Sequence, residues 1–339
     1  MAMRQLPLGK LPPDLLETLL HRHRPSDPSI LLGPDIGLDC AVVRSGDSLL
    51  VLKSDPITFA SEDIGWYAVQ VNANDIATTG TRPAWFLATI LLPGSKTDEA
   101  LVTSIFDQIG SACQELGILW VGGHSEVTHG LDRPILAGTM MGVTTQEALI
   151  TPRGLRPGDA ILLTKGIAIE GTSILAREFA PHLSGLPRGA IERAKGFLQD
   201  PGISVVPEAL AAAKTGKVHA MHDPTEGGLA MGLWEFARAA GVAIEVERAK
   251  IPILPETEAL CARLDVDPMA LIASGALLLG ASTPDAAEVI HAIEACGVPV
   301  RAIGQAMQGS GVFWVDDDKR EPMVPPARDA LAEIYERIG

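Results

Sequence analysis

Acidic side chains stand at the ends of apolar stretches in the first half of the chain. Asp39 lies in "GLDCAVV", Asp55 ends "LLVLKSDP", and Asp75 lies in "VQVNANDIATTG". Carboxylates that converge repel one another unless a cation lies among them, and oxygen ligands favour Mg²⁺ together with substrate phosphates. Asp35, which precedes Asp39 in "GPDIGLDCAVV", and Glu126 at the end of "ILWVGGHSE" extend this pattern, which indicates a divalent-cation site among these carboxylates and leaves open which of them bind the ion.

Each of these residues also fits a purely structural role. Asp39 lies close to a glycine and would serve in a turn, as would Asp55 before Pro56. Asp75 would serve as a helix cap or as a solvent-facing residue. Spacing alone does not decide between the two interpretations, but several carboxylates at strand and helix ends favour a site.

The segment "VGGHSEV" follows a predicted strand. Gly122 and Gly123 would let the backbone approach a phosphate closely, and His124 would be a ligand or a hydrogen-bond donor. The alternative is a tight turn with an exposed histidine.

The segment "HDPTEGGLAMG" turns the chain between a predicted strand and a predicted helix. Asp223 lies in the turn, Thr225 is the predicted N-cap, and Gly227 and Gly228 would offer free N–H groups to an anion. The alternative is a capped helix without a ligand. Two glycines in a first turn cost about 1 kcal/mol each relative to alanine, which favours the anion site.

The surrounding elements predict two domains of mixed character. Helices are expected at 63–79 and 97–117, a hairpin is expected around Ser45-Gly46-Asp47, and strands alternate with helices in both halves. The elements expected in the second half are helices near 170–180, 187–198, 206–215, 226–241, 255–264 and 284–296 and strands near 161–165, 218–221, 242–246, 271–280 and 299–303. A segment rich in Pro, Gly and Arg near residue 150 marks the boundary between domains 1–150 and 151–339. Because many strands look like antiparallel partners, the expected fold class is α+β or mixed α/β, not a doubly wound parallel sheet.

Bulk properties exclude several classes of protein. The 339 residues suit two domains, and the net charge of -15 argues against nucleic acid or an anionic membrane as a partner. The first ten residues lack the apolar region of a secretory signal, and no apolar run spans a membrane. The four scattered cysteines predict reduced thiols in a cytoplasmic protein. No Walker motif occurs, so ATP would bind through another design.

Taken together and in this order, the motifs resemble the AIR synthase-related, or PurM-like, superfamily of aminoimidazole ribonucleotide synthetase, selenophosphate synthetase, thiamine-monophosphate kinase and the hydrogenase maturation factor HypE. The resemblance runs from "LGKLPPDLL" to "RAIGQ" and is greatest to the HypE-type branch. It rests on "GLDCAVV", "LKSDP", "VNANDIATTGTRP", "VGGHSEV", "RPGDAILLTKGIAIEGTSIL", "HDPTEGGL" and "ASGALLL".

The resemblance implies an N-terminal α/β domain whose strands form a β-barrel across a homodimer, and a C-terminal α+β domain. It also implies ATP in a cleft between the domains and Mg²⁺ on the N-terminal aspartates. Many relatives have Asp where this chain has His124. The implied metal ligands are Asp39, Asp55 and Asp75; the nucleotide-binding residues are Asn74, Gly122, Gly123, Thr225, Gly227 and Gly228; and the catalytic residues are Asp75, His124 and Asp223.

The sequence departs from two hallmarks of the relatives. HypE ends in a tail with a terminal cysteine, whereas this sequence ends "EIYERIG" and its last cysteine is Cys296. The reactive cysteine or selenocysteine of selenophosphate synthetase is also absent from the N-terminal glycine-rich region, where only Gly9 and Lys10 stand.

We therefore expect a cytoplasmic homodimeric enzyme that uses Mg-ATP to phosphorylate an oxygen of an amide, carboxylate or hydroxyl group. The acceptor would be a small molecule or a group carried by a partner protein. One alternative is a HypE-like maturation factor that dehydrates a carbamoyl group with a maturation partner. Another is a non-catalytic ATP-binding regulatory or scaffold protein.

Overall fold

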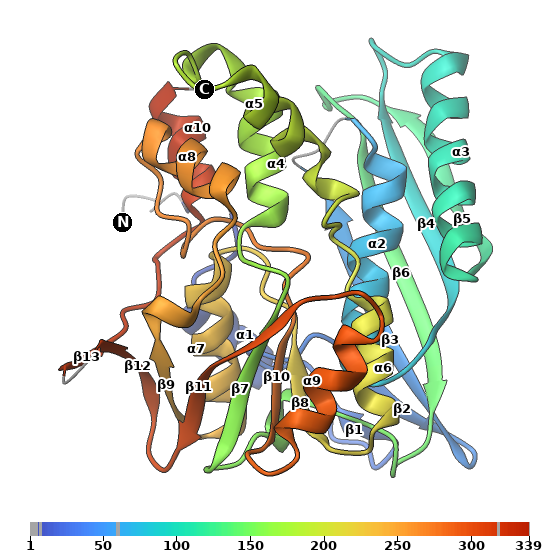
Figure 1. Cartoon of the computed structure of the whole chain (residues 1–339). Coiled ribbons are helices and arrows are strands. Elements are labelled where there is room, and N and C mark those ends of the chain that lie inside the picture. Colours follow the sequence, from blue (N-terminus) through green and yellow to red (C-terminus); the bar gives the residue numbers. More distant parts are fainter. Residues whose placement is uncertain (1–5, 7–8, 59–61, 317–318, 339) are drawn as a thin grey trace, which may run out of the picture. The chain divides into compact units, whose positions relative to one another are not determined.

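The computed structural model describes residues 6, 9–58, 62–316 and 319–338, and these form two compact units (Figure 1). The N-terminal unit consists of Pro25–Gly33 and Asp39–Leu149, and the C-terminal unit consists of Met1–Arg24, Pro34–Leu38 and Ile150–Gly339. Two segments that precede residue 150 in the sequence thus group with the C-terminal unit.

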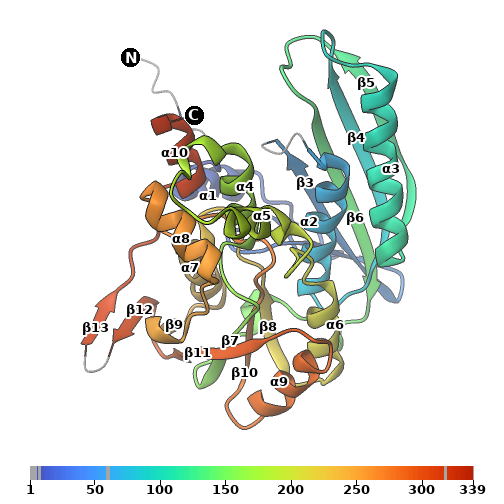
Figure 2. The same ribbon diagram turned by 45° about the horizontal axis from the view of Figure 1, so that its top comes forward.

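The N-terminal unit is a six-stranded sheet with two helices on one face (Figure 2). The strand order is β1-β2-β3-β6-β4-β5, which leaves β5 at one edge. All neighbouring strands are antiparallel except the parallel pair β4 and β5. The elements are β1 (Ile30–Leu32), β2 (Ala41–Ser45), β3 (Ser48–Ile57), α2 (Ile64–Thr78), β4 (Pro83–Pro93), α3 (Glu99–Leu116), β5 (Leu119–Thr128) and β6 (Ile135–Thr144).

Local sequence signals explain how these elements begin and end. Gly46, at a positive φ of 61°, turns β2 into β3, as expected for the predicted hairpin. Asp98 caps α3 by accepting a hydrogen bond from the backbone N–H of Leu101, and Gly117 ends this helix in the left-handed conformation. The N-cap is therefore Asp98 and not Thr97, the residue that the sequence suggested as the start of this helix.

Helix α2 is buried on nearly all sides, between the sheet and α3. A buried polar side chain needs hydrogen-bond partners, and Asn72 finds them on β3. Its Oδ1 accepts from the backbone N–H of Asp55 at 3.0 Å, and its Nδ2 donates to the Asp55 carbonyl at 3.3 Å. Gly138 makes room for this amide, because a Cβ there would lie 2.5 Å from the Asn72 Nδ2.

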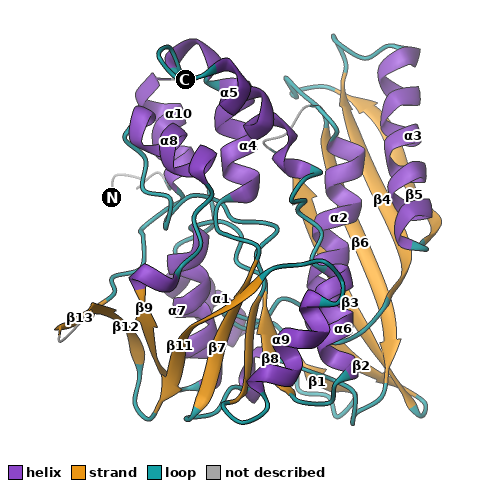
Figure 3. Cartoon of the chain, viewed as in Figure 1, coloured by secondary structure: helices purple, strands orange, loops and turns teal. Residues whose placement is uncertain are grey.

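The C-terminal unit contains a seven-stranded sheet in the order β13-β12-β9-β11-β7-β10-β8 (Figure 3). Its neighbouring strands are antiparallel except β12 and β9. The strands are β7 (Asp159–Thr164), β8 (Val218–His222), β9 (Ala243–Glu247), β10 (Leu278–Ser282), β11 (Val300–Met307), β12 (Gly311–Asp316) and β13 (Lys319–Pro322).

Helices complete the C-terminal unit and form two apolar clusters with its other elements. One cluster joins the sheet to α7 through Leu233 and Phe236, and the other joins α4, α5, α8 and α10. None of the helices in the described residues is long and apolar enough to cross a membrane. The helices are α1 (Pro13–Arg22), α4 (Ile169–Glu178), α5 (Arg188–Lys195), α6 (Val206–Lys214), α7 (Gly228–Ala240), α8 (Pro255–Leu264), α9 (Ala286–Glu294) and α10 (Ala330–Ile338).

The two mixed sheets confirm the predicted α+β class. In the described residues of a single chain neither sheet closes into a barrel, since each sheet has two end strands. Strands β12 and β13 and helix α10 were not among the predicted elements.

The Asn72 side chain allows a direct test of how α2 is fixed to β3. Asn72→Ala would leave the buried N–H of Asp55 without this acceptor, so we expect the free energy of unfolding to fall by roughly 1–3 kcal/mol in urea denaturation. The control is Gln146→Ala, which removes an exposed hydrogen bond to Arg44 and should change stability by less than about 0.5 kcal/mol. Equal effects of the two substitutions would contradict a clamping role for Asn72.

Candidate functional site

The predicted carboxylates of the N-terminal unit gather around one lysine. Lys53 and Asp55 are two residues apart on β3, so their side chains lie on the same face of the strand. The Lys53 Nζ lies 3.3 Å from Oδ2 of Asp55 and 3.3 Å from Oδ1 of Asp75, which comes from α2. Helix α2 contacts β3 along this face, which is why residues 20 positions apart in the sequence meet.

The charge state of Lys53 follows from these neighbours. Burial by itself would lower the pKa of the ammonium, but the attraction of Asp75, Asp55 and Asp39 outweighs burial and raises the pKa well above 10.5. Lys53 is therefore a permanent cation among three carboxylates. The side chain of Asp75 is only 5% exposed, while that of Asp55 is 38% exposed, so the group opens toward solvent on the Asp55 side.

The backbone around the carboxylates is firmly placed. The Cys40 thiol, next to Asp39, donates to the backbone carbonyl of Asp75 at 3.2 Å. Asn72 fixes the backbone of Asp55, and Asn74 is buried beside Asp75. Three carboxylates and one ammonium carry a formal charge of about −2, and oxygen donors with this charge fit Mg²⁺. The structure thus brings Asp39, Asp55 and Asp75 together within one unit.

Gly122, Gly123 and His124 lie in the middle of β5, so the predicted turn at this point is wrong. The pairing with β4 shifts by one residue between Trp120 and Gly122, which makes a β-bulge. A Cβ on Gly123 would lie 1.8 Å from the Ala88 carbonyl oxygen, so this glycine is needed for strand pairing. Close packing of the backbone explains Gly123 without a phosphate.

The side chain of His124 is 65% exposed and its Nε2 lies 3.3 Å from a carboxylate oxygen of Glu126. The exposed histidine is the alternative that the sequence left open. Next to it, Phe106 and Trp120 pack with ring centroids 5.1 Å apart and line an open depression of about 410 Å³ along β5.

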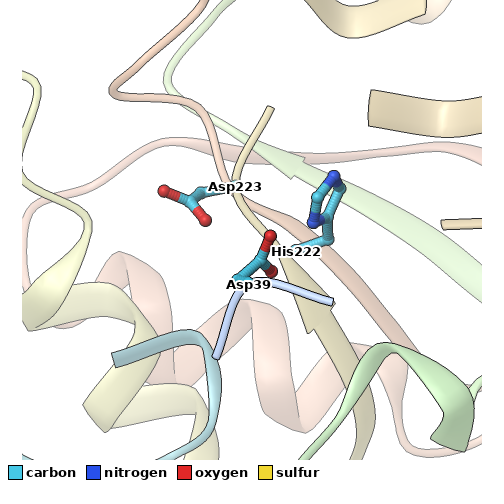
Figure 4. Close-up of side chains that lie close together, drawn as sticks. All are labelled: Asp39, His222 and Asp223. Atoms are coloured by element: carbon cyan, nitrogen blue, oxygen red, sulfur yellow. The ribbon is translucent and has the colours of Figure 1, made fainter. Parts of the chain in front are cut away.

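In the C-terminal unit, β8 ends at two buried polar residues, His222 and Asp223 (Figure 4). The imidazole of His222 lies 3.3 Å from a carboxylate oxygen of Glu235 and stacks on Phe236. Asp223 is 2% exposed. The contacts of His222 with α7 therefore anchor the start of the turn that follows.

The predicted anion site at the start of α7 needs correction. The N–H of Gly227 donates to Oδ2 of Asp329 at 2.5 Å, and the N–H of Gly228 donates to the Thr225 carbonyl at 3.0 Å. Neither group is free for an anion. Thr225 is also not the N-cap, because the cap position is Gly227 and the Thr225 hydroxyl donates to Glu226.

Packing accounts for both glycines. Gly227 and Gly228 have positive φ angles of 80° and 63°, which side chains rarely adopt. A Cβ on Gly227 would lie 2.6 Å from Cβ of Met231, and one on Gly228 would lie 2.5 Å from the Met269 carbonyl oxygen. The conformation and packing of this turn therefore require both glycines, and their presence does not indicate a ligand.

A group of buried carboxyls that the sequence did not suggest lies beside this turn. Burial, together with Glu226 and Asp329, raises the pKa of Glu170 to about 7, against a weaker opposite effect of a hydrogen bond from Ser274. Burial likewise raises the pKa of Asp329 to about 6, although the N–H groups of Gly227 and Leu331 stabilise its carboxylate. These two groups bind protons near neutral pH.

Two known protein families match the chain, one in each half of the sequence. The family described as AIR synthase related protein, N-terminal domain, matches residues 37–144. Its C-terminal counterpart matches residues 156–316, so that the two matches cover most of the chain. The chain belongs to the AIR synthase related family.

Relatives within this family place the chain in its HypE-type branch. Carbamoyl dehydratase HypE of Azotobacter vinelandii is 30% identical over 257 residues, which are 75% of this chain and 71% of the relative. The protein of the same name from Cupriavidus necator is 29% identical, over 76% of this chain and 72% of the relative. A selenide, water dikinase of Rhizobium meliloti is 29% identical, over 73% of this chain and 69% of the relative.

Solved structures of AIR synthase related proteins share the fold. The match to the E. coli HypE structure covers 95% of this chain and 99% of the HypE chain, with a TM-score of 0.74 and 20% identity. The match to a structure of HypE in complex with ATP covers 92% of this chain and 91% of that HypE chain, with a TM-score of 0.69 and 22% identity. The relatives are named as enzymes, a carbamoyl dehydratase and a dikinase, and the chain is a member of an enzyme family.

The structure also shows what sequence reasoning missed. Lys53 stands in the motif "LKSDP" and is not among the predicted site residues. The spacing of Lys53 and Asp55 indicates such a role, because residues two positions apart share a strand face and a lysine is rare in an apolar strand. Glu170 and Asp329 gave no such signal, because their proximity depends on a contact across 159 positions of sequence.

The raised pKa of Glu170 predicts how stability changes with pH. The native state binds a proton on Glu170 up to pH near 7, whereas the unfolded state loses it near 4.5. Stability contributed at this position therefore falls as pH rises from about 4.5 to about 7, by at most about 3 kcal/mol. Glu170→Gln removes this loss, so the variant should gain stability over wild type between about pH 5 and about pH 8 in urea denaturation.

The matched control for this experiment is Glu178→Gln, an exposed glutamate on the same helix α4. Its pH profile should run parallel to that of the wild type. A Glu170→Gln profile that also runs parallel would show that Glu170 does not titrate between these pH values.

Proposed function

We propose that this protein is a Mg-ATP-dependent enzyme that transfers a phosphoryl group to an oxygen of an acceptor. The observation that supports the proposal best is the convergence of Asp39, Asp55 and Asp75 around Lys53 in the N-terminal unit. Acidic residues with one ammonium suit a metal-bound polyphosphate. Relatives named as a dikinase and a HypE with bound ATP support the same reaction class.

The chain's own groups would act by positioning and by charge. The three aspartates would hold Mg²⁺, which supplies neutralising charge to the β- and γ-phosphates of ATP. Asn72 keeps Asp55 in place on β3, and the hydrogen bond from Cys40 keeps the α2 backbone at Asp75 in place. Two further sets of roles stay predictions. They are nucleotide binding by Asn74, Gly122, Gly123 and Thr225, and catalysis by His124 and Asp223.

The acceptor in this proposal is an amide, carboxylate or hydroxyl oxygen, of a small molecule or of a partner protein. A HypE-like dehydration of a carbamoyl group is the second candidate, and the relatives named carbamoyl dehydratase favour it. In that case a maturation partner is expected, as in the solved complex of HypE with HypF. ATP hydrolysis that depends on a carbamoylated partner would separate this candidate from a kinase with a small-molecule acceptor.

Asp75→Asn tests the proposed site directly. The substitution removes a buried charge next to Lys53, so we expect the affinity for a non-hydrolysable ATP analogue with Mg²⁺ to fall by about tenfold or more in calorimetric titration. Asp107→Asn, at an exposed position on α3, should bind the analogue as the wild type does. Unchanged affinity in Asp75→Asn would reject the assignment of this site, and binding without turnover of any acceptor would favour a regulatory role.

We also propose a homodimer that forms along β5. This edge strand is largely exposed, with Leu119, Val121 and Val127 at 63%, 52% and 58%. Exposed apolar side chains on an unprotected sheet edge are typical of a protein interface. The open depression beside Phe106 and Trp120 would receive side chains of the second copy.

A charge at this edge should prevent association. Val127→Asp places a carboxylate in the proposed interface, so we expect a monomer in sedimentation analysis where the wild type is a dimer. Val324→Asp is the control, because Val324 is 82% exposed in the other unit and should leave the dimer intact. A wild type that sediments as a monomer would rule out the β5 interface.

A further inference from the structure

The cluster of Asp39, Asp55 and Asp75 already contains a cation. The Nζ of Lys53 lies 3.3 Å from one oxygen each of Asp55 and Asp75. A metal ion that joins two carboxylates must also lie between one oxygen of each, at about 2.0–2.1 Å for Mg²⁺. The ammonium therefore stands where such an ion would bind, and the two cations exclude each other by size and by charge.

The carboxylates and the lysine differ in how freely they move. The backbone at Asp55 is fixed by two hydrogen bonds from Asn72, and α2 at Asp75 is fixed by the thiol of Cys40. The side chain of Asp75 is almost completely buried, so it has no route to water. Lys53 carries its ammonium on a flexible four-carbon stem, whereas the Asp55 and Asp75 carboxylates are attached by one carbon to a fixed backbone, so the lysine is the member whose charged end can move away.

We infer that the Lys53 ammonium is a built-in counter-ion that closes the space between Asp55 and Asp75 to a divalent cation in the free protein. A metal ion then enters between these two carboxylates only when phosphate oxygens draw the lysine away. The inference deepens the proposed function, because it rests on Mg-ATP as the ligand of this site. It assigns Lys53 a positioning role that sets the order in which metal and nucleotide bind.

The experiment measures the binding of Mn²⁺ alone, as a paramagnetic substitute for Mg²⁺, to the full-length protein without nucleotide. Free Mn²⁺ is counted by electron paramagnetic resonance in titrations of wild type, Lys53→Met and Lys53→Arg. We expect weak binding to wild type and to Lys53→Arg, and at least about tenfold tighter binding to Lys53→Met, in which Asp55 and Asp75 lack their cation. The control Lys96→Met removes an exposed lysine that donates to the Asp132 carbonyl and should bind Mn²⁺ like the wild type.

Equal Mn²⁺ affinity of wild type and Lys53→Met would overturn the inference. Because Lys53→Met leaves two carboxylates uncompensated and is at risk of not folding, Asp55→Asn provides a second test. If Lys53 occupies the site, this substitution changes Mn²⁺ binding to the free protein by less than about threefold, since Asp55 is not a ligand there. A loss of tenfold or more in Asp55→Asn would show that the free protein binds the ion at Asp55 despite Lys53, against the inference.

These outcomes are separate from those that decide the proposed function. A protein that binds no ATP analogue but gains Mn²⁺ affinity in Lys53→Met would lose its proposed function and keep Lys53 as the counter-ion. A protein that binds Mg-ATP and shows no effect of Lys53→Met would keep the function and lose the inference.

Discussion

The pairing of the Asn72 amide with the backbone of Asp55 is the interaction on which the site of the N-terminal unit depends. It joins helix α2 to strand β3 through two hydrogen bonds of a completely buried side chain. Since an amide that is buried without partners costs stability, the helix has one preferred register on the strand. That register brings Asp75, from the helix, to Lys53 and Asp55 on the strand.

The charges of these residues determine what the site can bind. Two buried or half-buried carboxylates near each other would not both stay ionised in an apolar setting, and Lys53 makes the arrangement stable. The same excess of negative charge that requires the lysine also prepares the site for a metal-bound phosphate. In the C-terminal unit, by contrast, burial and the nearby carboxylate of Glu226 act on Glu170 and Asp329, and their pKa values rise toward neutrality.

Sequence patterns predicted those features that depend on local spacing. The α+β class, the hairpin at Gly46 and the helix that carries Asp75 follow from periodicity and turn residues. The prediction of a turn at Gly122 was wrong because a strand bulge and a turn both select glycine. The prediction of a free N–H group at Gly227 was wrong because its acceptor, Asp329, lies 102 positions away in the sequence. Contacts of this kind depend on tertiary packing, which periodicity does not encode.

The most direct test of the account is a crystal structure of the wild type with a non-hydrolysable ATP analogue and Mn²⁺, in which anomalous scattering locates the ion. We expect an anomalous peak within ligand distance, about 2.0–2.3 Å, of carboxylate oxygens from the set Asp39, Asp55 and Asp75. We also expect that the Lys53 ammonium has moved from Asp55 and Asp75 to a phosphate oxygen. A peak away from these aspartates, or a nucleotide bound elsewhere with Lys53 unmoved, would contradict the account.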